Sequence, residues 1–436
     1  MRLTPVIIAG GKGARLWPLS HDGGPKPFLR IADDQSLLQL TLRRLASLGE
    51  IERPLIVCNA RHEQAIREHA VAAGFAGLAM LLEPEGRNTA AAICAAALWS
   101  MKKHLANEPL LIMPADHIIV DESRFASTIM AAAELVTQQK IVTFGMKPDR
   151  PAAGYGYIEL GASIDEDRAQ FRVERFVEKP DAVRAAEFLA TGRHYWNSGM
   201  FLATPATLIS EFALCRPDIL AQVEKAFPAG DVGDRVHLDH AAFAQVEAIA
   251  FDRAVMERTA SAATVLAEIG WSDVGDWQSM WEAAPKDDRG NALRGPVSTV
   301  DTANSLIRSE GPELLCIGLE DIVAVATSDA VLVAKREYAQ KIGEFVERAR
   351  RGPAQKALFT SSQYDLSQGE TRIADDNHAR LRVFVCVKGR GQIATGVKEH
   401  ALEEGSAIVC GPGETCRIQA NADSFLRVIE IRIDET

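Results

Sequence analysis

Residues 5–15 of the chain read PVIIAGGKGAR. Residues 5–9 form a continuous apolar run, which is typical of a parallel strand buried on both faces. The glycines that follow let backbone N–H groups approach a ligand, and Arg15 can bind phosphate oxygens in a bidentate manner. The run is not a P-loop, because Lys12 is followed by glycine, and Leu16 stands where a dinucleotide fingerprint needs a third glycine. We interpret it as a phosphate-binding turn, the structural alternative being a tight turn with a solvated arginine.

Apolar runs alternate with helical stretches over residues 1–288. Strands are predicted at 5–9, 54–58, 110–113 and 141–144, and helices at 37–48, 61–73 and 88–99. Such alternation predicts a doubly wound, Rossmann-like α/β sheet, in which ligands bind beyond the carboxyl ends of the strands. The turns that follow strands are therefore the expected places for catalytic residues.

The pattern changes near residue 288. Residues 289–353 contain short β runs with no helix between them, followed by a predicted helix at 337–350, and this predicts a small β-solenoid unit. Another β-rich unit, 354–436, follows a Gly-Pro boundary at 352–353. The chain is thus expected to contain three domains, 1–288, 289–353 and 354–436.

Composition excludes several classes of protein. The 436 residues carry a formal net charge of −11, which argues against non-specific nucleic-acid binding. No apolar run approaches the ~20 residues that a membrane-spanning helix needs. The seven cysteines are scattered and form no Cys-x-x-Cys pair, and no signal-peptide pattern is evident. These features predict a cytoplasmic protein with reduced thiols.

The phosphate turn continues into LWPLS at 16–20 and PKPFL at 25–29. The whole run resembles the signature of sugar-1-phosphate nucleotidyltransferases, and its tryptophan and Lys-Pro-Phe segment resemble the mannose-1-phosphate guanylyltransferase branch. The resemblance implies a GT-A-like catalytic domain, in which Arg15 and Lys26 hold the triphosphate of GTP. The backbone under the base and ribose would be that of Gly10, Gly11 and Gly13.

The segment EPEGRNTA at 83–90 resembles a guanylyltransferase motif that would close over the base. A carboxylate at Glu83 could accept from both the N1–H and the 2-amino group of guanine, a pairing that other bases cannot offer. The alternative for Glu83 is a solvated acid before a proline turn. Asn88 is likewise expected at the nucleotide, and it and Thr89 could instead be helix caps.

Two further segments, MPADH at 113–117 and GWSDVG at 270–275, also resemble family motifs. They imply that Asp116 and Asp273 hold Mg²⁺, which takes one or two carboxylates together with phosphate oxygens and water. Asp276 stands where relatives often have Ser or Thr, and it ranks below Asp273 as a ligand. His117 is expected to form a structural hydrogen bond.

The sugar phosphate is expected to be held by three segments, GYGYI (154–158), FVEKP (176–180) and YWNSGMF (195–201). By resemblance, the backbone at Gly156 and the side chains of Glu178 and Asn197 would contact sugar hydroxyls, while Lys179 neutralises the phosphate. The Glu178–Lys179 pair could alternatively be a solvated ion pair.

The reaction implied by the resemblance is GTP plus α-mannose 1-phosphate giving GDP-mannose and diphosphate, by in-line attack of the sugar phosphate. The attacking oxygen is already ionised, so no general base is needed, and Arg15, Lys26, Lys179 and Mg²⁺ would neutralise charge. The alternatives are another sugar-1-phosphate nucleotidyltransferase and a non-catalytic GDP-mannose sensor. A homodimer is expected.

Residues 354–436 resemble in outline the cupin domain of phosphomannose isomerases, with VCVKG at 385–389 and PGETCRI at 412–418. The metal-binding residues of that family are replaced, by Asn377, Ala379, Arg382 and Cys416. Because the usual histidine and glutamate ligands are missing, we expect a degenerate cupin without isomerase activity, serving dimer contact or regulation.

Overall fold

In the computed structural model, Val6 and Ile7 of β1 (Thr4–Ala9) are both completely buried, and they belong to different core clusters. Because successive side chains of a strand point to opposite faces, β1 must be covered on both sides. This explains the continuous apolar run. The structure describes residues 2–433 apart from 11–13, 21–23, 33–34, 76, 231, 352–358, 375–380, 396–397 and 411–414.

A ten-stranded sheet forms the centre of the first of two compact units, Met1–Gly343. In spatial order its strands are β12 (Arg235–His237), β5 (Ala79–Glu83), β4 (Leu55–Asn59), β1, β6 (Leu110–Pro114), β11 (His194–Ala203), β8 (Ile141–Met146), β13 (Ala262–Ala267), β10 (Gln170–Glu178) and β9 (Gly156–Asp165). The part from β12 to β6 is parallel, whereas β11 runs antiparallel to β6 and β8.

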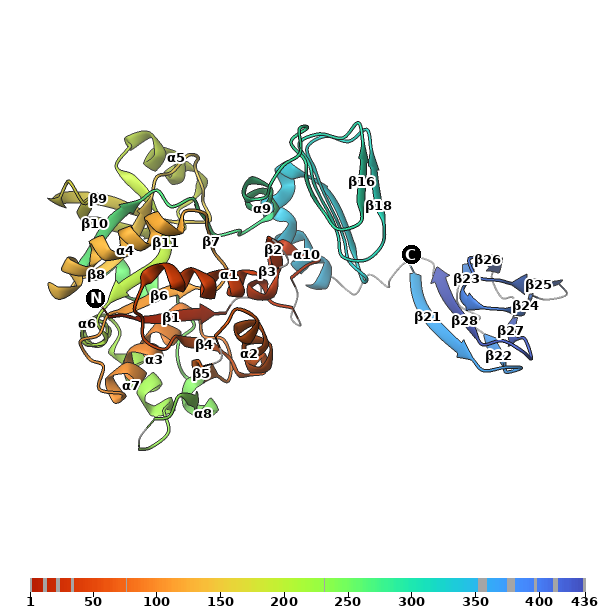
Figure 1. Ribbon diagram of the computed structural model, residues 1–436, viewed down its shortest axis with the longest axis horizontal. Coiled ribbons are helices and arrows are strands. Elements are labelled where there is room, and N and C mark those ends of the chain that lie inside the picture. Colours follow the sequence, from red (N-terminus) through yellow and green to blue (C-terminus); the bar gives the residue numbers. More distant parts are fainter. Residues whose placement is uncertain are drawn as a thin grey trace. The chain divides into compact units, whose positions relative to one another are not determined.

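Helices cover both faces of this sheet (Figure 1). The face that carries Ile7 packs against α1 (Leu37–Arg44), α2 (Glu63–Ala72), α4 (Glu122–Thr137) and α5 (Ala182–Thr191). The face that carries Val6 packs against α3 (Asn88–Lys102), α6 (Pro205–Cys215), α7 (Pro217–Ala226) and α8 (His240–Phe243). The doubly wound α/β prediction is therefore confirmed, and Gly10, Glu83 and Asp116 lie at or just beyond the carboxyl ends of β1, β5 and β6.

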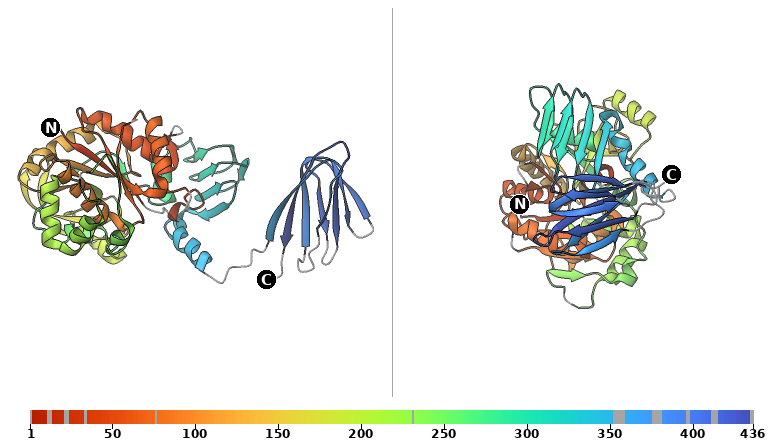
Figure 2. Two further views of the ribbon diagram at one scale, coloured as in Figure 1. Left: turned by 90° about the horizontal axis from the view of Figure 1, so that it is seen from below. Right: turned by 90° about the vertical axis from the view of Figure 1, so that its right-hand side faces the viewer.

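A short β-solenoid completes the first unit. Its strands are β15 (Ala292–Arg294), β16 (Val297–Val300), β17 (Leu306–Ser309), β18 (Leu314–Ile317), β19 (Ile322–Ala326) and β20 (Val331–Lys335), seen side by side in Figure 2. β15, β17 and β19 form one parallel sheet and β16 and β18 a second, with Ile307 and Cys316 buried between them. β20 turns back antiparallel to β19 and ends the winding. The predicted solenoid is thus confirmed.

The solenoid is followed by a 3-10 turn, η6 (Arg336–Lys341), and by α10 (Ile342–Arg351). The predicted helix at 337–350 is therefore regular only from Ile342. The Arg336 guanidinium stacks 3.7 Å from the centre of the Trp281 ring of α9 (Trp277–Ala283), so η6 packs against α9. Among the described residues, no helix is long and apolar enough to cross a membrane.

The second unit, Glu344–Thr436, contains two four-stranded antiparallel sheets. One consists of β21 (Phe359–Leu366), β28 (Leu426–Ile433), β23 (Leu381–Gly389) and β26 (Ala407–Cys410), and the other of β22 (Thr371–Ala374), β27 (Cys416–Ala420), β24 (Gly391–Thr395) and β25 (Lys398–Leu402). Phe384, Ile418 and Val428 are among the side chains of their common core. This arrangement agrees with the cupin-like fold expected from the sequence.

Candidate active site

A cleft with a volume of about 660 Å³ opens at the carboxyl edge of the parallel strands. Gly10, Glu83 and Asp116 line it from the ends of β1, β5 and β6, and Gly156 and Asn197 line it from β9 and β11. Residues that are far apart in the sequence therefore meet in one cavity.

Lys26 lies at the centre of the predicted metal and phosphate region. It starts a 3-10 turn, η2 (Lys26–Phe28), and only 7% of its surface is exposed. Its Nζ lies 2.8 Å from Oδ2 of Asp116 and also donates to the backbone carbonyl of Asp273. Burial alone would raise the pKa of the Asp116 carboxyl, but the Lys26 charge and hydrogen bond outweigh it and hold that pKa below its usual value. The structure thus joins three residues that the sequence predicted separately.

The carboxylate of Asp273 is held in place by its own loop and by a tyrosine. Oδ1 accepts from the Tyr155 hydroxyl at 2.9 Å and from the backbone N–H of Gly275 at 3.0 Å. A Cβ at position 275 would lie 2.7 Å from Oδ2 of Asp273, so this close turn requires glycine. Sequence reasoning considered only the backbone around Tyr155 and missed its hydroxyl. No motif marks this role.

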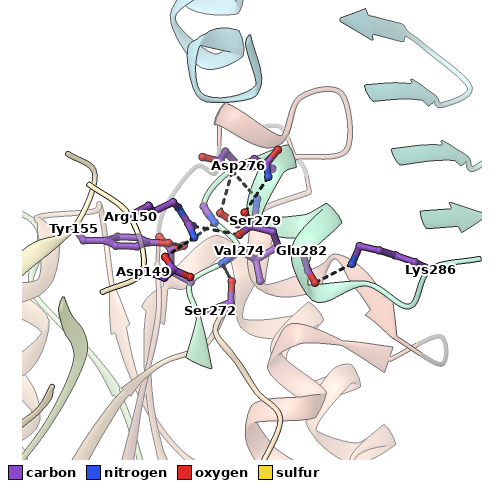
Figure 3. A network of polar contacts seen from close by, with 12 residues as sticks. Asp149, Arg150, Tyr155, Ser272, Val274, Asp276, Ser279, Glu282 and Lys286 are labelled. Carbon is purple, nitrogen blue, oxygen red and sulfur yellow. Dashed lines mark hydrogen bonds and ion pairs between the residues drawn. The ribbon is translucent and has the colours of Figure 1, made fainter. Parts of the chain in front are cut away.

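Asp276 has a different role from Asp273. It is the N-cap of α9, where Oδ1 accepts from the backbone N–H of Ser279 at 2.8 Å and from its hydroxyl at 3.0 Å (Figure 3). Its side chain is 5% exposed, and it is not among the residues that line the cleft. The Asp276 carboxylate therefore caps α9, which supports ranking Asp276 below Asp273 as a metal ligand.

His117 forms the structural hydrogen bond expected of it. Its Nδ1 lies 3.1 Å from the indole N–H of Trp271, which can only donate, so the neutral ring carries its proton on Nε2. Burial lowers the pKa of His117 to about 4. The ring is consequently uncharged at neutral pH.

Arg15 lies in the 3-10 turn η1 (Ala14–Leu16), and its side chain is exposed. It does not line the cleft itself, but its Nη1 lies 3.7 Å from the point where a Cβ on Gly154 would be, and Gly154 does line it. Leu16 is completely buried and anchors the turn. The predicted nucleotide residues Gly11 and Gly13 lie outside the described residues.

The base end of the cleft is marked by a buried acid. Glu83 is 7% exposed, and its Oε1 has no hydrogen-bond partner among the described residues. Burial raises the pKa of Glu83 to about 8. Asn88 also lines the cleft at a left-handed φ of 63°, and its Oδ1 accepts from the backbone N–H of Thr89 at 2.8 Å at the start of α3. The Thr89 hydroxyl accepts from the backbone N–H of Phe251, outside α3, so of these two side chains only that of Asn88 bonds to the start of the helix.

The three predicted sugar segments meet at the other end of the cleft. Glu178 pairs with Gly156 across β9 and β10, and a Cβ at position 156 would lie 2.8 Å from Oε2 of Glu178. Lys179 adopts a left-handed φ of 48°, and its Nζ lies 2.8 Å from Oε1 of Glu178. Asn197 is fixed at both ends of its amide, because Oδ1 accepts from the Thr143 hydroxyl at 2.6 Å and Nδ2 donates to a carboxylate at 2.8 Å.

That carboxylate belongs to Asp252, which sequence reasoning missed. Asp252 begins the π-helical turn η5 (Asp252–Met256) and lines the cleft. Burial, together with the negative charge of Glu178, raises its pKa to about 7. Asp252 was not singled out because residues 251–256 match none of the motifs recognised in the sequence. A lone acid before an apolar segment gave no signal.

The second unit holds a buried polar cluster where the cupin resemblance expects metal ligands. Arg382 is 1% exposed, with its Nη2 3.3 Å from Sγ of Cys416 and its Nη1 3.6 Å from Oε1 of Glu430. The Tyr364 hydroxyl donates to the same glutamate. A guanidinium thus occupies this part of the core. The predicted replacements Asn377 and Ala379 lie outside the described residues.

Comparison with known proteins adds independent findings. Residues 4–290 match the family model for nucleotidyl transferase, and residues 295–349 match that for the MannoseP isomerase/GMP-like beta-helix domain. The mannose-1-phosphate guanylyltransferase of Klebsiella pneumoniae is 36% identical over 452 residues, covering 99% of this chain and 96% of that protein. The alginate biosynthesis protein AlgA of Pseudomonas aeruginosa is 41% identical over 454 residues, covering 99% and 93%.

A solved structure is also similar. The crystal structure of mannose-1-phosphate geranyltransferase from Thermus thermophilus superimposes with a TM-score of 0.70 at 31% identity. The similarity covers 80% of this chain and the whole of that one.

Proposed function

This chain belongs to the nucleotidyl transferase family, and from that membership we propose that it joins mannose 1-phosphate to GTP, forming GDP-mannose and releasing diphosphate. One observation carries the proposal. A single cleft brings together a buried acid with one oxygen unpaired among the described residues, two aspartates, one of which pairs with Lys26, and a cluster of polar groups suited to a sugar. The names of two relatives, mannose-1-phosphate guanylyltransferases of different bacteria, support the choice of substrates.

At the nucleotide end, Glu83 is proposed to read guanine. Its unpaired Oε1 is a buried acceptor, and a buried polar atom without a partner is costly unless a ligand supplies one. Guanine offers two adjacent donors to one carboxylate, whereas adenine and the pyrimidines do not. Arg15 and Lys26 would bind the triphosphate, with Gly10 and Asn88 beside the nucleoside.

Asp116 and Asp273 fit Mg²⁺. The Lys26 ammonium contacts a carboxylate oxygen of Asp116 and the backbone carbonyl of Asp273, so a cation already lies beside the Asp116 carboxylate. The described residues contain no group of three or more His, Cys, Asp or Glu side chains placed to hold a metal ion, and Mg²⁺ needs no such group when substrate phosphates complete its coordination. When bound, Mg²⁺ would neutralise charge on the phosphates. Lys26 would hold the Asp116 carboxylate and the backbone of Asp273 in place and contribute its own positive charge.

At the end of the cleft proposed to bind the sugar, most of the polar groups are hydrogen-bond acceptors. The Glu178 carboxylate, the second oxygen of Asp252 and the remaining N–H of Asn197 can bind hydroxyl groups, while Lys179 can meet the phosphate. We include Asp252 in this subsite because its carboxylate both fixes Asn197 and lines the cleft.

The proposed chemistry is direct attack of a sugar phosphate oxygen on the α-phosphorus of GTP, with diphosphate leaving on the opposite side. The attacking oxygen is already ionised at neutral pH, so no side chain has to remove a proton. The chain's residues align the two anions and reduce their repulsion. By analogy with other preorganised donors, loss of Arg15 or Lys26 should lower turnover by at least ~10²-fold.

The test is diphosphate release from each common NTP with a panel of sugar 1-phosphates and Mg²⁺. GTP with mannose 1-phosphate should be the preferred pair, and Asp116→Ala should abolish its turnover in a protein that is still folded at the assay temperature. Preference for another pair would reassign the substrates within the family. No release with any pair would indicate a non-catalytic binding protein.

Two further proposals concern the whole chain. The second unit is proposed to lack isomerase activity, because Arg382 lies where the cupin resemblance expects a metal-binding glutamate. The homodimer and the cytoplasmic location expected from the sequence stay predictions.

A further inference from the structure

Arg15 lies between two glycines. On one side is Gly154, which lines the cleft. On the other is Gly343, a buried residue in the first turn of α10. A Cβ on Gly343 would lie 2.9 Å from Cγ of Arg15 and 3.4 Å from both its Cα and its backbone N. The helix that follows the solenoid therefore touches the stem of an arginine in the phosphate-binding turn, and it can do so only without a side chain.

The segment that carries Gly343 is firmly held. Ala339 and Ile342 are 1% and 4% exposed. In η6, Arg336 stacks on Trp281 of α9 and forms a 2.5 Å hydrogen bond with Asp321. A buried and anchored helix start is a rigid surface for Arg15, because its side chains cannot move aside freely.

The start of α9 holds the next residues of the same turn. Trp277 is completely buried, and its indole N–H donates to the backbone carbonyl of Trp17 at 3.2 Å. Residues 15–17 are thus fixed by α9 and α10 together, although both helices lie outside the strands that form the cleft. This contact gives the turn a defined position before any ligand binds.

We propose that Gly343 is a positioning residue for the triphosphate, because its missing side chain allows α10 to fix the direction of the Arg15 side chain. The proposal rests on the proposed function in taking Arg15 as a triphosphate ligand. A guanidinium that is already aimed along Gly154 loses less conformational freedom on binding than a free one. It also keeps the reacting phosphates aligned, where a displacement of about 1 Å can lower the rate ~10²-fold.

Gly343→Ala tests this directly. Alanine is the better helix former by about 1 kcal/mol, so the substitution should not weaken α10 itself. Its methyl group should displace Arg15 and lower kcat/KM for GTP by roughly tenfold or more. In the reverse reaction the KM for diphosphate should rise, whereas the KM values for mannose 1-phosphate and GDP-mannose should stay unchanged. A purely structural role would affect all substrates alike.

The matched control is Glu344→Ala, an exposed neighbour on the same helix, which should keep wild-type kinetics. In an Arg15→Ala background, where Cγ is absent, Gly343→Ala should have little further effect. If Gly343→Ala alone lowers the melting temperature, the additional Arg15→Ala substitution should restore it. Native kinetics for Gly343→Ala, an equal loss in both backgrounds, or a melting temperature not restored by Arg15→Ala would each overturn the proposal. Turnover by the wild type in the same assay tests the proposed function separately.

Discussion

Replacing Glu83 with glutamine should remove a pH dependence from GTP binding. In the absence of ligands Glu83 is almost completely buried, one of its carboxylate oxygens has no partner in the described part of the chain, and burial raises its pKa to about 8. At neutral pH the side chain is therefore mainly the uncharged acid. Guanine, however, would present two donors to it, and these require the carboxylate.

The size of the effect follows from the pKa. If only the ionised enzyme binds GTP well, the apparent KM is divided by the ionised fraction. With a pKa of about 8, that fraction is about one in ten at pH 7 and about one in a hundred at pH 6. The KM for GTP should thus fall nearly tenfold from pH 6 to pH 7, and it should become constant above pH 8.

The assay measures the KM for GTP from pH 6 to 8.5 at saturating mannose 1-phosphate and Mg²⁺, in wild type and Glu83→Gln. Ionisation of GTP itself affects both enzymes, so their ratio isolates the side chain. Inosine triphosphate, which lacks the 2-amino group, gives a second measure. It should bind the wild type roughly 10- to 100-fold more weakly than GTP, as expected for a lost hydrogen bond to a charged group, and Glu83→Gln should discriminate less.

Stability provides an independent check on the same residue. A carboxyl whose folded-state pKa is raised favours the folded state below its unfolded pKa of 4.5 and loses that stability as the pH rises towards 8. At pH 7 the loss is roughly 3 kcal/mol. Glu83→Gln should therefore raise the melting temperature of the nucleotide-free enzyme at pH 7, but not at pH 4.5. A KM for GTP that is independent of pH, or that falls towards low pH, would refute the role of Glu83 as a carboxylate.

Four other substitutions test further features of the two units. Asp252→Asn should raise the KM for mannose 1-phosphate about tenfold, as expected when a hydrogen bond to a charged group is lost, and leave the KM for GTP unchanged; equal changes in both would argue against a sugar subsite. Asp276→Ala should lower stability by about 1 kcal/mol through loss of the helix cap, with kcat nearly retained, whereas Asp273→Ala should lose turnover; loss of activity in both, measured beside thermal melting, would restore Asp276 as a ligand. Arg382→Met should destabilise the second unit by roughly 3–5 kcal/mol, because Glu430 would keep a buried charge without its guanidinium, and diphosphate release should be unchanged.

The sequence predicted those parts of the site that follow strands or lie in motifs. The apolar run of β1 implied a strand buried on both faces, and the two core clusters that contain Val6 and Ile7 explain why that inference was sound. Lys26 and Asp116 were both expected in the site, but their ion pair was not, since pairing depends on how the loops fold over the sheet.

The features that escaped prediction depend on tertiary contacts between segments without motifs. Asp252 acts through Asn197, and the pattern around it does not differ from that of an ordinary solvated acid. Gly343 is important because of what lies next to it in space, and a glycine in a helical stretch reads as a weak helix position. Asp276 was ambiguous for the opposite reason. It sits beside a motif acid, and only the hydrogen bonds from Ser279 reveal a cap.

The charge of the cleft explains why proton and cation binding should accompany catalysis. Five carboxyl groups line it, those of Glu83, Asp116, Glu178, Asp252 and Asp273. The proposed reaction would nevertheless bring two polyanions there, and Lys26 and Lys179 are already paired with acidic residues in the absence of ligands. The raised pKa values of Glu83 and Asp252 reduce this repulsion before ligands bind, because both acids are partly uncharged near neutral pH. In the proposed complex, substrate hydroxyl and amino donors would replace the protons, and a divalent cation would offset the charge that remains. GTP binding should therefore release protons and weaken sharply when Mg²⁺ is chelated.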